Sequence, residues 1–269
     1  KNQNPLGTIV LSAAASFSVD KLTGEILDNT GRQDRFALQD CARHILTTEE
    51  PDIKKKHRIY TCCRMPVGDL VSVLKSKEHQ KGFFGNVMTC QNIWACPVCS
   101  SIVSERRATE VREACSIAKE RGLKVTMVTL TTRHGIDDEL SSLIDGISLA
   151  FRSFTSHRTF KKYRQAFGVV GFIKATEVTY SDANGWHPHF HIIMFSKDSL
   201  PSGFSWTGAY GRKHVASLPE IWQLCCEKAS LPIPDLTHGF KISDENVSLE
   251  DKLAEYVSKF ADQTKLDLS

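Results

Sequence analysis

The sequence has no apolar run approaching the ~20 residues that a membrane-spanning helix requires, so we expect no membrane partner. It also has no internal repeat and no low-complexity tract, which argues against a solenoid or a fibrous protein. Its formal net charge is only +3 over 269 residues, so any affinity for nucleic acid must come from local clustering of charge. With 41% hydrophobic and 24% charged residues, the composition is that of a globular protein large enough to bury a core.

The nine cysteines are unevenly spaced, which is unlike the disulfide framework of a small secreted protein. Cys96-Pro-Val-Cys99 instead has the spacing of a zinc knuckle, with Cys90 and the adjacent Cys62 and Cys63 upstream of it. These residues predict a structural Zn²⁺ site, to which only one of Cys62 and Cys63 need contribute. The alternative for the CxxC pair is two small buried side chains. Reduced thiols also indicate a reducing compartment, and we expect the protein in the cytoplasm.

Local composition predicts three parts of the chain. Residues 1–50 are polar and weakly patterned, and we interpret them as a loosely packed N-terminal extension. Residues 51–110 form a basic segment for zinc and DNA binding, because ten Lys or Arg stand against three acidic residues between 54 and 107. Residues 111–269 make up the remaining, largest domain.

A second basic run lies between Phe151 and Ala175, where there are six Lys or Arg and no acidic residue. A charge run is usually only a solvated face, but the absence of acidic residues and the interleaved aromatic residues favour a surface that contacts phosphates. From the two basic segments, the predicted DNA-binding residues are Arg106, Arg107, Arg158, Lys161, Lys162 and Arg164.

Hydrophobic periodicity and turn residues predict a mixture of helices and strands. The predicted helices cover 100–121, 138–165, 216–229 and 248–260, and Gly122 follows the first of them as its C-terminal cap. The predicted strands cover 123–132, 169–180 and 186–195. The last two strands form a hairpin around the turn at 181–185, where a glycine can supply a positive φ.

The segment HPHFH at 187–191 falls in the second strand of this hairpin. Alternate side chains of a strand share a face, so His189 and His191 present two imidazoles together. A five-residue turn sets a register in which Glu177 of the first strand faces His189. Two histidines and a carboxylate predict a site for a divalent metal, Mn²⁺ or Mg²⁺, with positions open for substrate oxygens. The alternative is a half-exposed polar strand whose histidines are satisfied by hydrogen bonds.

Tyr256 and Lys259 are three residues apart on the predicted helix 248–260, so a phenol and an ammonium group share one helix face. That spacing suits a pair acting on one phosphate. It suits equally well a core tyrosine, because Tyr256 borders the apolar stripe of the same helix.

Four motifs occur in one order: CQNIWACPVCSSIVSERR, VTMVTLTTRH, KATEVTYSDANGWHPHFHIIMF and AEYVSKF. In this order they resemble the rolling-circle replication initiators of bacterial plasmids, which belong to the HUH endonucleases. The resemblance covers roughly residues 85–260. It implies an α+β fold, a central antiparallel sheet with helices packed on it, preceded by the zinc-knuckle segment. It makes residues 111–269 the catalytic domain.

The resemblance also implies roles for individual residues. His189, His191 and Glu177 become ligands of the catalytic metal, Tyr256 the nucleophile and Lys259 its helper. The implied reaction nicks single-stranded or hairpin origin DNA, leaves a 5′-phosphotyrosine link and a free 3′-OH, and later rejoins the strand. A host helicase and a DNA polymerase are then the expected partners.

Four other functions fit parts of the sequence. A transposase or a conjugative relaxase would use the same histidines, although a relaxase typically carries its tyrosine before them. A two-His-one-carboxylate iron oxygenase usually has its histidines far apart, unlike His189 and His191. A zinc-dependent DNA-binding regulator would explain the cysteines but would leave Glu177 and the histidines without a role.

Overall fold

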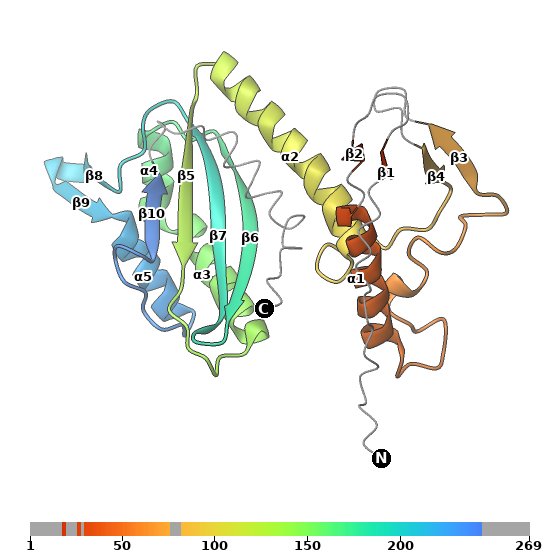
Figure 1. The fold of residues 1–269 in the computed structure, drawn as a ribbon. Helices are drawn as coiled ribbons and strands as arrows, with labels where there is room; N and C mark the ends of the chain where they lie inside the picture. The colour runs from red at the N-terminus through yellow and green to blue at the C-terminus, as the bar shows by residue number, and fades with distance from the viewer. Residues whose placement is uncertain (1–17, 20–25, 28–29, 76–81, 244–269) are drawn as a thin grey trace. The chain divides into compact units, whose positions relative to one another are not determined.

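The structure is a computed structural model and describes residues 18–19, 26–27, 30–75 and 82–243 (Figure 1). The predicted helix at 248–260, with Tyr256 and Lys259, lies outside the described residues. The chain divides into two compact units, one of residues 1–107 with 258–269 and one of residues 108–257. No helix in the described ranges is long and apolar enough to cross a membrane.

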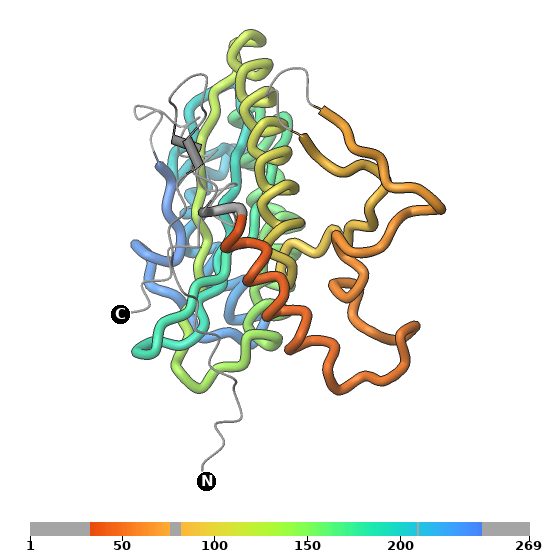
Figure 2. The backbone as a smooth tube through the Cα atoms, turned by 45° about the vertical axis from the view of Figure 1, so that its right-hand side comes forward, coloured from red at the N-terminus to blue at the C-terminus, as the bar shows by residue number. Residues whose placement is uncertain are grey.

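The first unit contains little regular structure, and Figure 2 shows much of it as irregular orange and yellow chain. Its strands form two short antiparallel pairs, β1 (Ser18–Val19) with β2 (Ile26–Leu27) and β3 (Ser72–Lys75) with β4 (Gly82–Gly85). Its helices are α1 (Thr30–Thr47), the short 3₁₀ helix η1 (Arg58–Tyr60) and the start of α2 (Pro97–Glu120).

The interpretation of residues 1–50 as a loosely packed extension is wrong for α1. One face of this helix is buried, and it consists of the polar residues Gln39, Arg43 and Thr47. Arg43 donates from Nε to the carbonyl oxygen of Ile59 at 3.3 Å, which ties α1 to η1. Because the buried face is polar, hydrophobic periodicity does not reveal the helix.

The second unit is built on a four-stranded sheet in the order β10-β5-β7-β6, with every neighbouring pair antiparallel (Figure 1). Its strands are β5 (Lys124–Thr131), β6 (Gly171–Ser181), β7 (Gly185–Ser196) and β10 (Phe240–Ser243). The helices are α3 (Leu140–Ser156), α4 (Arg158–Ala166) and α5 (Leu218–Lys228). The α+β fold with a central antiparallel sheet is therefore confirmed.

The two faces of this sheet differ in what they pack against. One face presents Phe190 and Ile192 to a core that includes Phe154 of α3 and Trp222 of α5. The opposite face is apolar at one end only, where Ile193 packs with residues of α2 such as Cys115. Beyond that end, the alternation of β7 brings His191, His189 and then His187 to the same face. The sheet therefore has one polar end, which carries the histidines, on a face whose other end is packed against α2.

Some boundaries differ from the predictions. The predicted helix 138–165 is two helices, because His157 adopts an extended backbone (φ −61°, ψ 135°) and its Nδ1 accepts from the amide of Thr159. The predicted helix at 216–229 begins at Leu218, since Ser217 is its N-cap and ends the preceding strand. That strand, β9 (Lys213–Ser217), pairs with β8 (Gly203–Thr207) in a hairpin that was not predicted.

The helix predicted at 100–121 is confirmed with an earlier start. It begins at Pro97, where a proline costs no hydrogen bond because the first N–H groups of a helix are unpaired. It therefore starts inside the CxxC motif. Gly122 follows its end with φ +70°, as predicted for the capping glycine.

Candidate functional site

The predicted register of the hairpin is confirmed, and it builds the first cluster. Glu177 of β6 pairs directly with His189 of β7, as Tyr180 does with Trp186. The strands run one residue further than predicted at the turn, where Ser181 pairs with Gly185. The carboxylate and both imidazoles therefore lie on one sheet face, and their ligand atoms all fall within 4.8 Å of one another.

The three side chains converge on a single oxygen. The Nε2 atoms of His189 and His191 lie 3.0 and 2.8 Å from Oε2 of Glu177. All three side chains are nearly buried, with 8 to 14% of their surface exposed. The hydrogen bond from His189, followed by that from His191, lowers the pKa of Glu177 well below its usual range, although burial opposes the shift. The carboxylate is therefore ionised at neutral pH.

A second layer of contacts orients the histidines. Nδ1 of His189 lies 3.4 Å from the carbonyl oxygen of His187, and Nδ1 of His191 lies 3.2 Å from the hydroxyl of Thr129 on β5. A carbonyl oxygen only accepts, so the contact with His187 would keep a hydrogen on Nδ1 of His189 when Nε2 exchanges its hydrogen bond to Glu177 for a metal ion. Such a donor set fits a divalent cation, which would take these three ligands and leave positions for phosphate oxygens.

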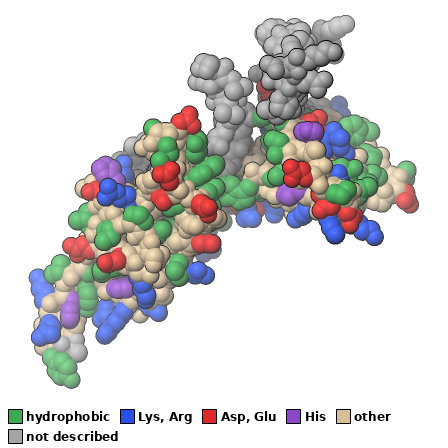
Figure 3. Space-filling model, turned by 90° about the horizontal axis from the view of Figure 1, so that it is seen from below, with side chains coloured by type: hydrophobic (Ala, Val, Ile, Leu, Met, Phe, Trp, Pro, Cys, Tyr) green, Lys and Arg blue, Asp and Glu red, His purple; other side chains and the backbone are tan. Residues whose placement is uncertain are grey.

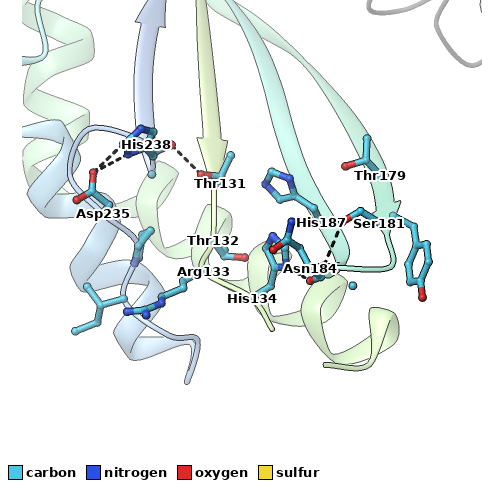
Figure 4. Close-up of a pocket in the computed structure, with 15 residues that line it drawn as sticks. Thr131, Thr132, Arg133, His134, Thr179, Ser181, Asn184, His187, Asp235 and His238 are labelled. Carbon is cyan, nitrogen blue, oxygen red and sulfur yellow. Dashed lines mark hydrogen bonds and ion pairs between the residues drawn. The ribbon is translucent and has the colours of Figure 1, made fainter. Parts of the chain in front are cut away.

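A cavity of about 780 Å³ lies at the end of the sheet where β5 stops and the β6–β7 hairpin turns (Figure 4). His134 and His187 lie on one side of it, and Asp235 and His238 lie on the other. Burial, with the neighbouring His189, lowers the pKa of His187 to about 4, so this ring is neutral. The cavity therefore lies at the end of the sheet next to the Glu177 cluster, with His187 in its lining.

The sequence reasoning did not identify most residues of this cavity. His187 was predictable, because alternate residues of a strand share a face and it precedes His189 and His191 at the same spacing. His134 lies three residues after the end of β5, but its position depends on a contact across the fold, a 3.0 Å interaction of Nδ1 with the carbonyl oxygen of Asn184. Asp235 and His238 lie in a loop with no motif.

The second cluster consists of four buried thiols, from Cys62, Cys90, Cys96 and Cys99. Sγ of Cys62 lies 3.5 Å from that of Cys99 and 3.8 Å from that of Cys96. Cys63 has a half-buried side chain and is not part of the group, so the choice left open by the adjacent pair falls on Cys62. Four cysteines at this spacing are the donor set of a structural zinc site, and the cluster fits the predicted zinc knuckle.

Electrostatics within the thiol cluster favour one thiolate. The hydrogen bond from the thiol of Cys99, with a further one from the amide of Gln39, lowers the pKa of Cys96 to about 4. Burial raises the pKa of Cys62 to about 12. Gln39 also donates from Nε2 to both sulfurs, at 3.1 Å to Cys96 and 3.4 Å to Cys62. It is an orienting residue that no sequence motif indicated.

The predicted DNA-binding residues do not share one environment. Arg106 and Arg107 are exposed on α2, and Arg158 and Lys161 are exposed on α4. Lys162 and Arg164 are half-buried, and Nε of Arg164 is buried without a hydrogen-bond partner among the described residues. The aromatic residues interleaved with this basic run belong to the core, where Phe160 and Tyr163 are at most 1% exposed. Burial raises the pKa of Tyr163 further above its usual value.

An antiparallel sheet with helices on one face, a Glu–His–His cluster on the other and a separate four-thiol cluster define an α+β protein suited to bind two metals. The family Rep_1, described as "Replication protein", matches residues 81–260. The chain belongs to this family of replication proteins. The match includes both histidine ligands, three of the four clustered cysteines and the AEYVSKF segment, and it confirms the initiator family that the motifs predict.

Two of three individual relatives carry names that agree with this assignment. A "Protein rep" of Streptomyces lividans is 30% identical over 214 residues, covering 65% of this chain and 47% of that protein. A "Protein rep" of Streptococcus pneumoniae is 23% identical over 173 residues, covering 60% and 50%. A "Neomycin resistance protein" of Streptomyces cyanogenus is 30% identical over 132 residues, covering 40% and 30%. The chain thus spans at most half the length of these relatives, and no solved structure matches it.

Proposed function

We propose that this chain nicks and rejoins single-stranded or hairpin origin DNA to initiate rolling-circle replication. The observation that carries the proposal is the convergence of Glu177, His189 and His191 on one sheet face. A bound Mn²⁺ or Mg²⁺ would polarise the scissile phosphate and offset the charge that develops on it. Membership of a replication protein family favours this activity over that of a transposase, a relaxase or an iron oxygenase.

The nucleophile in this proposal is Tyr256, with Lys259 one helical turn further on. The phenolic oxygen forms a bond to phosphorus, the bond from phosphorus to the 3′ oxygen breaks, and the phenolic proton is lost. A phenol has a pKa near 10, so the ammonium group of Lys259 favours the reactive phenolate. The product is a 5′-phosphotyrosine and a 3′-OH, and attack by a 3′-OH on this ester rejoins the strand.

The same proposal extends to cofactors and partners. The free 3′-OH is the end that a DNA polymerase extends, and strand displacement calls for a helicase, so these host proteins are the proposed partners. We assign catalysis to residues 111–269. The Cys62, Cys90, Cys96 and Cys99 cluster would hold a Zn²⁺ that supports the fold and takes no part in the reaction.

The test uses labelled single-stranded oligonucleotides that tile the replicon encoding the protein, incubated with Mn²⁺ and resolved on a denaturing gel. The wild type should form a covalent adduct, and Tyr256→Phe should abolish it while leaving DNA binding nearly intact. Tyr60→Phe, in the first unit, is the matched control and should react normally. A Tyr256→Phe variant that cuts at even about a tenth of the wild-type rate would exclude Tyr256 as the nucleophile.

A further inference from the structure

A second cavity, of about 820 Å³, lies between helix α4 and the β8–β9 hairpin. Three cationic side chains line it, Arg158 and Lys162 from α4 and Arg212 from the hairpin turn. The remaining lining residues are Thr159, Trp206, Gly208, Tyr210 and His214. Three cations around one groove without an acidic residue in its lining raise the local positive potential, which suits an anionic ligand. Figure 3 shows Lys, Arg and His side chains gathered at the left-hand end, where Figure 1 places β8 and β9.

The hairpin wall of this groove is aromatic and firmly attached to the core. Trp206 stacks on Phe204 with ring centroids 5.1 Å apart and on His214 at 5.0 Å. Phe204 packs edge-on against Tyr163 of α4 at 5.2 Å, and the Tyr163 hydroxyl donates to the carbonyl oxygen of Pro201 at 2.8 Å. These contacts hold the hairpin against α4, so the two walls of the groove are fixed relative to each other.

Lys162 connects the two walls of the groove. Its Nζ lies 5.4 Å from the centroid of the Trp206 ring, which is within the range of a cation–π contact. The contact holds the ammonium group over the hairpin and keeps it inside the groove.

The turn of the hairpin presents Tyr210 to solvent. Its side chain is fully exposed, and its φ of +65° lies in the left-handed region that is uncommon for any residue but glycine. Gly208 leaves room for the His214 ring beside the turn, because a Cβ at that position would lie 2.7 Å from Nε2 of His214. The amide of Gly208 then donates to the carbonyl oxygen of Arg212 at 2.7 Å and closes the turn. A constrained turn thus exposes a large aromatic ring at the edge of a cationic groove.

We propose that this groove binds a short stretch of single-stranded DNA, with phosphates on Arg158, Lys162 and Arg212 and a base stacked on Tyr210. Cationic grooves edged by exposed aromatic rings suit single strands, whose bases are open for stacking, whereas a duplex hides its base faces. The inference rests on the proposed function only for the choice of DNA as the anion.

The groove is distinct from the Glu177, His189 and His191 cluster. Phe204 and Tyr163, which support it, belong to the core on the sheet face that carries Phe190, opposite the histidines. A strand in the groove would therefore be DNA flanking the cleavage point, held while the scissile phosphate lies at the other face.

The experiment measures the binding of fluorescein-labelled oligothymidylate by anisotropy, with the full chain carrying Tyr256→Phe. Tyr210→Ala should weaken binding at least about fivefold, because base–aromatic stacking is lost and no packing is disturbed. Arg212→Gln should lower the slope of log K against log salt by about 0.7. Val215→Ala, exposed on the same hairpin but outside the groove lining, is the matched control and should bind normally.

The outcomes separate this inference from the proposed function. Equal affinity of Tyr210→Ala and Val215→Ala for oligothymidylate overturns the groove, even if the wild type still forms its covalent DNA adduct. Weakened binding by Tyr210→Ala, together with a protein that forms no covalent adduct when Tyr256 is intact, supports the groove and overturns the nicking activity. If Tyr210→Ala weakens binding to a duplex of the same length as strongly, the groove does not select single strands and the inference is wrong.

Discussion

The imidazole rings of His134 and His187 stack with their centroids 4.6 Å apart and their planes inclined by 24°. His187 is in turn 5.0 Å from the ring of His189, and His189 is 4.7 Å from that of His191. A row of four rings therefore leads from the cavity at the end of the sheet to the Glu177 cluster. Through these ring contacts, the segment that follows β5 helps to fix the position of the histidines beside Glu177.

Gly185→Ala should disturb this row. Gly185 has φ +72°, and a Cβ there would lie 2.9 Å from the carbonyl oxygen of Gly135, next to His134. Strain and displacement of that loop should cost about 1–3 kcal/mol of unfolding free energy and reduce nicking. Denaturant unfolding and the nicking assay measure the two effects. Gly171→Ala, with no atom near its Cβ and no positive φ, should change neither, and equal behaviour of both variants would contradict the argument.

His189→Ala and His191→Ala should each reduce metal-dependent cleavage at least about a hundredfold, because a ligand of the metal is lost. Far-UV circular dichroism should stay unchanged, since the side chains lie on a sheet face outside the apolar core. His44→Ala, exposed on α1, is the control. If wild type treated with a chelator cleaves as fast as protein loaded with Mn²⁺, the metal role is wrong.

The thiol cluster should hold about one Zn²⁺ per chain, since four cysteines fill its coordination. Elemental analysis of protein prepared without chelator measures the content. Cys96→Ser should lose the metal and lower the melting temperature, whereas Cys41→Ser, exposed on α1, should keep it. Gln39→Ala should weaken zinc binding about tenfold or more, because it removes an orienting contact to two ligands. Full zinc retention by Cys96→Ser would refute the site.

DNA binding should weaken steeply with salt, because the basic residues at 54–64, 106–107 and 152–174 would neutralise several phosphates. For single-stranded DNA, each lost phosphate contact lowers the slope of log K against log salt by about 0.7. Lys161→Ala, exposed on α4, should therefore reduce the slope by that amount. A flat dependence in the wild type would leave the basic surface without a role.

The hairpin and its metal ligands were predictable because they depend on local rules. Strand alternation places His189 and His191 on one face, and the turn length then pairs Glu177 with His189. The zinc cysteines were predictable from the CxxC spacing, apart from the choice between Cys62 and Cys63. The hairpin prediction needs only a single turn and the CxxC prediction only neighbours in sequence, whereas the contact of Cys62 with that pair depends on folding across more than 30 positions.

The features that escaped prediction depend on contacts across the chain or on exceptions to simple patterns. The helix α1 buries polar residues because Gln39 and Arg43 satisfy sulfur and carbonyl groups of other segments. The break at His157 depends on one side chain that caps a helix, in a run whose composition favours a continuous helix. The β8–β9 hairpin depends on a turn in which Tyr210 takes a conformation that sequence rules reserve for glycine.

The separation of the ligands along the chain bears on the order of folding. Glu177 is only 12 and 14 positions from the two histidines, so the ligand set is complete as soon as one hairpin closes, an event of microseconds. Cys62, in contrast, is 34 and 37 positions from Cys96 and Cys99, and Gln39 is 57 from Cys96. Closing loops of this length costs more chain entropy than closing the hairpin. A metal ion bound by the thiols would therefore contribute most to the stability of the first unit. The Glu177 cluster is therefore local and needs the closure of one hairpin, whereas the thiol cluster needs segments more than 30 positions apart to meet.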